Sequence, residues 1–214
     1  MAKRFFRVNG QESNLLYSAN LGLASFLSWF IRLSRFICVA QMTECIELIK
    51  HFESLELETY LCPASKLTIG YGCTREEHAY KGNKITQLVA EGLLTEDILE
   101  ARSKVLKRLA RSARSPELYA LTSQAFNLTT KSTSKLVSYF NQDKELYKNK
   151  SLLYNKDLKL KKTMNGLLIR RICERLLFEG QEWKHIATEL QHRNRLETTK
   201  MFIYKLFPDF PYKI

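Results

Sequence analysis

A helical pattern gives way at once to two short strand-like segments in the first third of the chain. Apolar residues recur at spacing three from Ile46 to Phe52, which is the period of one helix face. Residues 57–62 and 67–71 are then rich in strand formers, and a Pro-Ala-Ser turn sequence separates them. The sequence therefore predicts a helix over 43–53 that is followed directly by a β-hairpin.

Helical patterns dominate the rest of the chain. Thr86 is a suitable N-cap for a long helical region that reaches about Arg114. Ser115 and Pro116 open the next helix, with the proline at a permitted first-turn position. Three further helices are expected over residues 134–140, 167–178 and 183–190. A helix, a small sheet and then mostly helices indicate an α+β class that is mostly α.

The chain carries a net charge of +12, and a protein this basic is attracted to polyanions. Nucleic acid, anionic lipid and the carboxylate-rich bacterial cell wall are all candidates on charge alone. The densest basic run, Lys156 to Lys162, is typical of a solvated surface. Since no recognition motif and no basic stripe interleaved with aromatic residues occurs, we expect no nucleic-acid partner.

The five cysteines and four histidines do not follow a disulfide or metal-ligand pattern. An odd number of irregularly spaced cysteines is not a disulfide framework. There is no CxxC pair, and no histidine lies at zinc-like spacing from a cysteine. We therefore expect no metal site.

Residues 1–41 are interpreted as an N-terminal extension, and three readings stay open. Leu15 to Ile31 is uncharged and moderately apolar, near the lower length limit for spanning a bilayer, and two arginines follow it. The extension is an export signal or weak membrane anchor, an interfacial amphipathic segment, or a part outside the working protein. A transient membrane association through residues 15–40 is accordingly one expectation.

Three polar residues around the predicted hairpin are candidates for chemistry: Glu53, Cys62 and Thr68. Glu53 ends the apolar helix stripe directly after Phe52, and apolar surroundings favour the protonated form that a general acid needs. Cys62 ends the first strand and Thr68 lies on the second, so the hairpin can fold both back toward the helix end. A solvated carboxylate at a helix end is the alternative interpretation of Glu53.

The string around these residues resembles the start of phage-type lysozymes, glycoside hydrolase family 24. That family has a Glu, then Asp or Cys nine positions later, then Thr six positions further, as in Glu53, Cys62 and Thr68. The Thr-Ile-Gly-Tyr-Gly string from Thr68 matches as well. Further similar segments are Ala125-Phe126-Asn127 and the Gly-Leu, Arg-Arg and Glu signature over residues 166–178.

The resemblance implies a lysozyme-like fold, with an N-terminal helix, a small β-hairpin lobe and a helical C-terminal lobe. It implies hydrolysis of the β-1,4 bond between N-acetylmuramic acid and N-acetylglucosamine in bacterial peptidoglycan, without a cofactor. Glu53 would protonate the glycosidic oxygen, while Cys62 and Thr68 would hold the attacking water in an inverting arrangement. Asn127 is a candidate substrate-binding residue.

The same resemblance divides the chain into the extension 1–41, a lysozyme-like catalytic domain over 42–180 and a C-terminal helical extension over 181–214. We expect a monomer whose partner is peptidoglycan. The location is the host cell cytoplasm or, after export, the periplasm and cell wall, because the N-terminal segment leaves both open.

The chain departs from the family pattern at three places. Cys62 replaces the commoner Asp, and a thiol with a pKa of about 8.5 accepts a proton at neutral pH only if a neighbour lowers that pKa. Cys73 stands where a histidine is usual, for which we expect a loss of stability rather than of chemistry. The segment after Asn127 lacks the usual glycine and is short. A weakened lysozyme that binds peptidoglycan without cutting it is therefore the alternative function.

Overall fold

The computed structural model describes residues 42–62, 64–144, 146, 156–157, 162–163, 165–193, 201, 204–205 and 207–208. The chain divides into two compact units, Met1–Met42 and Thr43–Ile214. No helix among the described residues is long and apolar enough to cross a membrane. The predicted membrane-associated segment 15–40 lies outside the described residues.

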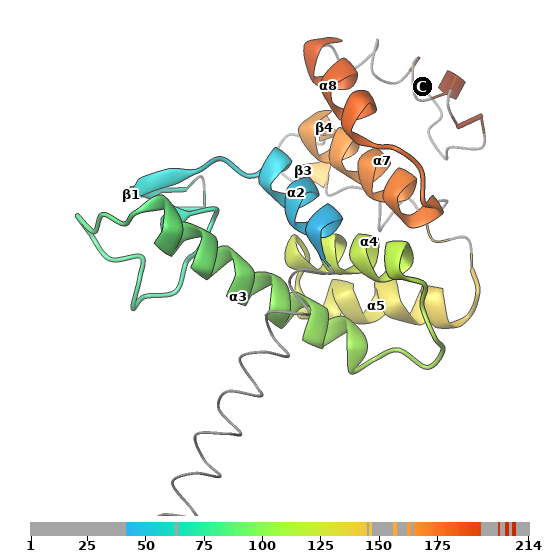
Figure 1. The fold of residues 1–214 in the computed structure, drawn as a ribbon, viewed down its shortest axis with the longest axis horizontal. Coiled ribbons are helices and arrows are strands. Elements are labelled where there is room, and N and C mark those ends of the chain that lie inside the picture. The colour runs from blue at the N-terminus through green and yellow to red at the C-terminus, as the bar shows by residue number, and fades with distance from the viewer. Residues whose placement is uncertain are drawn as a thin grey trace, which may run out of the picture. The chain divides into compact units, whose positions relative to one another are not determined.

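A helix and a hairpin open the second unit, as the sequence predicted (Figure 1). Helix α2, Thr43–Phe52, buries Cys45, Leu48 and Ile49 on one face. Strands β1, Glu56–Leu61, and β2, Leu67–Gly70, pair antiparallel, with Tyr60 opposite Thr68. Strand β2 is mostly buried, whereas β1 is mostly exposed. The hairpin therefore packs against the rest of the domain mainly through β2.

Helix α3, Gln87–Leu106, connects the hairpin to the helical part of the molecule (Figure 1). Thr86 caps it as predicted, since its side chain accepts a hydrogen bond from the Val89 N–H. The predicted end near Arg114 is wrong, and the helix stops at Leu106. The side chain of Asn141 explains the early end, because its Oδ1 accepts from the Ala110 N–H at 2.9 Å and its Nδ2 donates to the Arg108 carbonyl at 2.8 Å.

The remaining elements of the described residues are helices and a short ribbon of two strands. Their bounds are α4, Ser115–Phe126; α5, Thr130–Asn141; β3, Lys156–Asp157; β4, Lys162–Thr163; α7, Asn165–Glu179; and α8, Lys184–Arg193. Helix α5 begins four residues earlier than predicted because the Thr129 side chain accepts a hydrogen bond from the Ser132 N–H and caps it there. The class is α+β and mostly helical, as predicted.

One hydrophobic core joins the helices around α4 and α7. Leu48 of α2 and Leu121 of α4 belong to it, together with Leu168 and Ile172 of α7, and all four are fully buried. Trp183, Ala187 and Leu190 belong to the same cluster, so α8 packs on the domain rather than extending away from it. The candidate site lies where α2 ends against α7.

Candidate active site

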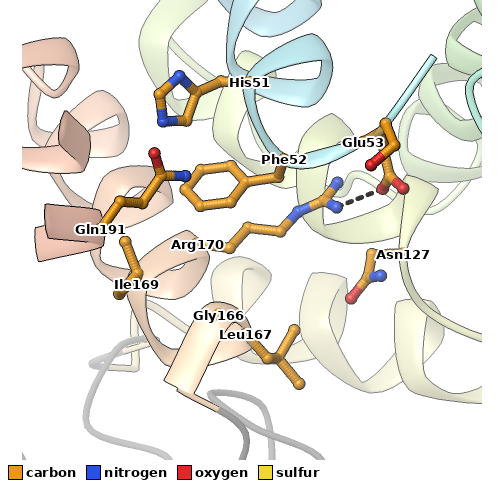
Figure 2. Close-up of a pocket in the computed structure, with 10 residues that line it drawn as sticks. His51, Phe52, Glu53, Asn127, Gly166, Leu167, Ile169, Arg170 and Gln191 are labelled. Carbon is orange, nitrogen blue, oxygen red and sulfur yellow. Dashed lines mark hydrogen bonds and ion pairs between the residues drawn. The ribbon is translucent and has the colours of Figure 1, made fainter. Parts of the chain in front are cut away.

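Glu53 follows the last residue of α2 and points toward α7 (Figure 2). Its backbone N–H still donates to the Ile49 carbonyl at 3.0 Å, which fixes the backbone at the helix end. Its Oε1 accepts from Nη1 of Arg170 at 2.5 Å, and the carboxylate is 24% exposed whereas the arginine is 4% exposed. The candidate acid is therefore held by a buried cation and remains open to solvent on one side.

Arg170 belongs to a buried network of charges on α7. Its Nε donates to Glu174 at 3.3 Å, and its Nη2 donates to the Ser123 carbonyl at 3.4 Å. Glu174 also pairs with Arg171 and accepts from the Ser123 hydroxyl at 2.7 Å. Two arginines are thereby balanced by the carboxylates of Glu53 and Glu174, as buried charges require.

Asn127 is tied to this network from the C-terminal end of α4. Its Oδ1 accepts from Nη2 of Arg171 at 2.6 Å. It also lines the pocket beside Glu53 (Figure 2). The predicted substrate-binding residue and the predicted acid therefore border the same cavity, and the arginine pair of α7 orients both.

Cys62 and Thr68 lie together across the hairpin. The Cys62 N–H donates to the Lys66 carbonyl at 3.0 Å, and the Thr68 hydroxyl donates to that same carbonyl at 3.1 Å. Hydrogen bonds from the Lys66 backbone and from the Thr68 side chain hold the pKa of the Cys62 thiol below its usual value. The neighbour that a proton-accepting thiol needs is therefore present.

Tyr60 and Gly72 connect the hairpin to Glu53. The pKa of the Tyr60 phenol is raised, first by burial and then by the negative charges of Cys62, Glu56 and Glu53, so the phenol lies within electrostatic reach of both candidate groups. Gly72 has a φ of +98°, and a Cβ at this position would lie 3.9 Å from Oε2 of Glu53. The backbone after β2 thus borders the carboxylate on its Oε2 side.

Two pockets flank the consecutive residues Phe126 and Asn127. The first, of about 450 Å³, is lined by Glu53, Arg170 and Asn127 together with side chains of α2, α7 and α8. The second, of about 310 Å³, is lined by the segment after β2, by α3 and by Phe126. Glu53 borders the first pocket, and the second is lined by Gly72, where an added Cβ would lie 3.9 Å from Oε2 of Glu53.

Comparison with known proteins assigns this architecture. The model of the family described as phage lysozyme matches residues 50–174. The chain belongs to the phage lysozyme family. It is therefore a lysozyme-type hydrolase, and the family implies peptidoglycan as its substrate. The recognition made from the Glu, Cys and Thr spacing is confirmed.

Individual relatives agree with the family assignment. The chain is 33% identical over 140 residues to the endolysin of Acyrthosiphon pisum secondary endosymbiont phage 1, covering 62% of this chain and 93% of the relative. It is 33% identical over 165 residues to the endolysin of Bacillus phage B103, covering 75% of this chain but only 62% of that relative.

A solved structure confirms the predicted lysozyme-like fold. The endolysin from Escherichia coli O157:H7 phage FAHEc1 superimposes with a TM-score of 0.56 at 28% identity, covering 64% of this chain and 90% of that one. The N-terminal helix, the hairpin and the helical lobe of this lysozyme therefore follow the arrangement expected of the family.

Two residues of the site were not assigned a role from the sequence. Arg170 was recognised only as part of a family signature, and its ion pair replaces the apolar surroundings expected for Glu53. The available signal was the spacing of Arg170 and Glu174, which lie four residues apart and so on the same face of the predicted helix. Tyr60 belongs to the Tyr-Leu-Cys-Pro-Ala segment that resembles the family, but that resemblance gave it no role.

The substituted position 73 is structural in this lysozyme. Cys73 is 3% exposed and packs with Ile69 and Leu93 in a small cluster under the hairpin. Two residues later, Arg75 pairs with Glu96 at 2.7 Å and with Asp97 at 3.3 Å, both on α3. These two ion pairs of Arg75 connect the segment after the hairpin to α3.

The short segment after Asn127 is closed by the early start of α5. Leu128 donates its N–H to the Ala125 carbonyl at 3.4 Å and lines the second pocket. Thr129 then caps α5, so no flexible glycine loop is needed at this point.

Among the described residues, no group of three or more histidine, cysteine, aspartate or glutamate side chains is arranged to hold a metal ion.

Proposed function

We propose that this lysozyme hydrolyses the β-1,4 bond between N-acetylmuramic acid and N-acetylglucosamine in peptidoglycan, with Glu53 as the general acid. The observation that carries the proposal is the Glu53 carboxylate, which lines a pocket, is held at Oε1 by Arg170 and keeps 24% of its side-chain surface exposed. A general acid needs a fixed position relative to the leaving oxygen, and the buried arginine supplies it.

Cys62 and Thr68 complete the proposed mechanism on the hairpin side. The lowered pKa of the Cys62 thiol favours the thiolate, and the adjacent hydroxyl of Thr68 offers a second polar contact to a water molecule. In the reaction, Glu53 gives its proton to the glycosidic oxygen while this pair takes a proton from the attacking water. The sugar then leaves with inverted configuration. Asn127 lines the same pocket as Glu53 and contributes to substrate binding there.

The test uses the full chain under reducing conditions, with uncrosslinked peptidoglycan strands as substrate. We expect the parent to release fragments whose new reducing end is N-acetylmuramic acid, with the α-anomer formed first, as read by mass spectrometry and NMR. Glu53→Gln should lower the rate by roughly 10²- to 10⁴-fold. The matched control is Glu58→Gln, an exposed carboxylate of the same hairpin that pairs with Lys84, and its rate should equal the parent rate.

Two outcomes would contradict the proposal. Fragments that end in N-acetylglucosamine would assign a different bond. A parent that sediments with the cell wall and releases no reducing ends would favour the alternative, a lysozyme-fold protein that binds peptidoglycan without cutting it.

Export or transient membrane association through residues 1–41 stays a proposal. Cell fractionation of one fusion that carries these residues and one that lacks them would test it.

A further inference from the structure

The pocket beside Glu53 has a wall that the family match does not cover. The match ends at residue 174, within α7, yet Gln191 of α8 lines the pocket together with Glu53 and Arg170. Figure 2 shows the Gln191 amide turned toward the Phe52 ring, with His51 on the same side of the pocket. The cavity of about 450 Å³ is within the size range of small-ligand sites.

Helix α8 is anchored firmly enough to present Gln191 at a fixed place. Trp183 is 2% exposed, and its Nε1 donates to Oε2 of Glu44 at 3.0 Å. Lys184 pairs with Glu47 of α2 at 2.7 Å. Leu190, the residue directly before Gln191, is fully buried in the core. The start and the end of α8 are thus both held, which limits where the Gln191 side chain can reach.

The groups on this wall are neutral hydrogen-bonding groups. Burial lowers the pKa of the His51 imidazole. A hydrogen bond with the Gln191 side chain raises that pKa, but by less than burial lowers it. The positive charge of Arg170 is already matched by Glu53 and Glu174. An amide offers two donors and a carbonyl acceptor, which suit the hydroxyl and acetamido groups of an amino sugar. Without a free cation among these side chains, the wall fits an uncharged saccharide better than the carboxylates of a stem peptide.

We propose that Gln191 binds the amino sugar that lies next to the cleaved bond, so that α8 is part of the substrate site of this lysozyme. The inference rests on the proposed function, because it assigns one sugar position in the same cleft. Gln191 is a binding residue in this account and takes no part in proton transfer. Its loss should weaken substrate binding and leave the chemical step unchanged.

The test compares the full-length parent with Gln191→Met, which keeps the length of the side chain and removes the amide. The substrates are soluble glycan strands whose stem peptides have been removed by an amidase, and the same strands with peptides intact. We expect the half-saturating concentration to rise roughly 3- to 10-fold on both substrates, as the loss of one hydrogen bond predicts, while kcat changes less than about twofold. Thermal unfolding should be unchanged because Gln191 is exposed.

The matched control is His192→Met, since His192 is the next residue of α8, is also exposed and is not among the residues that line the pocket. It should behave as the parent. The proposal is overturned if Gln191→Met has the parent half-saturating concentration on the peptide-free strands, or if the effect appears only when stem peptides are present. Release of reducing ends by the parent tests the proposed function separately, so the two failures are distinguishable.

Discussion

The two sides of the candidate site are held in different ways. On the helix side, Glu53 is fixed by Arg170, whose position depends on the buried Glu174 carboxylate of α7 and on a backbone carbonyl of α4. On the hairpin side, Cys62 and Thr68 are held by hydrogen bonds to a single carbonyl within seven residues of chain. The proton-donating side therefore depends on long-range packing, whereas the water-holding side is a local structure.

This contrast explains where substitution is tolerated. A local hairpin can present a thiol in place of a carboxylate without disturbing the core, because Cys62 lies at the surface of the hairpin and bears no part of the buried charge balance. A change at Arg170 or Glu174 instead leaves another buried charge without its partner. The predictions below test this difference.

The largest effect is expected on stability, from Glu174→Ala. Glu174 is fully buried and pairs with both Arg170 and Arg171, so its removal should destabilise the fold by about 3–5 kcal/mol. Urea unfolding of the full chain would measure this. Glu179→Ala removes a partly exposed partner of Arg175 on the same helix and should cost less than about 1 kcal/mol. Equal losses of stability in the two variants would show that the buried ion pairs of Glu174 stabilise the fold no more than the partly exposed pair of Glu179 does.

The next effect is expected on catalysis, from Arg170→Lys. A lysine keeps the charge but cannot hold Glu53, Glu174 and the Ser123 carbonyl at the same time. We expect kcat to fall roughly 10- to 100-fold with a smaller change in KM, because the acid is misplaced rather than removed. Steady-state kinetics on soluble glycan strands would test this. An unchanged kcat would mean that Glu53 does not need the arginine for its position.

A smaller effect is expected from Thr68→Val, which preserves side-chain volume at a buried position. Loss of the hydroxyl removes a hydrogen bond that favours the thiolate, so the pKa of Cys62 should rise. Alkylation of Cys62 at a series of pH values, followed by mass spectrometry of the labelled peptide, would report the shift. Activity should fall about tenfold. A thiol that titrates as in the parent would exclude Thr68 as its neighbour.

The smallest effect on rate is expected from Cys62→Asp, although its pH dependence should change. A proton acceptor must be ionised, so activity rises as the pH increases through the pKa of that group. The reference pKa of an aspartate carboxyl, about 3.9, is far below that of a thiol, about 8.5, so the aspartate variant should reach full activity at lower pH. We expect a maximal rate within about tenfold of the parent. An acidic limb at the same pH in both proteins would show that residue 62 does not accept the proton.

The hairpin side was predictable from the sequence because its determinants are local. Cys62 and Thr68 lie six positions apart, and the pairing of the two strands across one turn fixes their relation. The helix side was not predictable in the same way. Arg170 follows Glu53 by 117 residues, and periodicity carries no information on which helix faces will meet at that separation.

The same reasoning applies to the helix boundaries. Residues 107–114 favour a helix by propensity. However, the side chain of Asn141, from another helix, accepts a hydrogen bond from the Ala110 N–H and donates one to the Arg108 carbonyl. Tertiary contact thus decides the end of α3 against local preference. Helix α8 is closer to its prediction, because the expected range 183–190 differs from the observed Lys184–Arg193 by one residue at the start and three at the end.

The most direct measurement of the central claim is the leaving-group dependence of Glu53→Gln. The parent and the variant would be assayed on peptidoglycan strands and on a muramyl glycoside whose leaving group is dinitrophenolate, which departs without a proton. If Glu53 is the general acid, the variant should lose roughly 10²- to 10⁴-fold on the strands and less than about tenfold on the activated glycoside. An equal loss on both substrates would contradict the account, because Glu53 would then act on something other than the leaving oxygen.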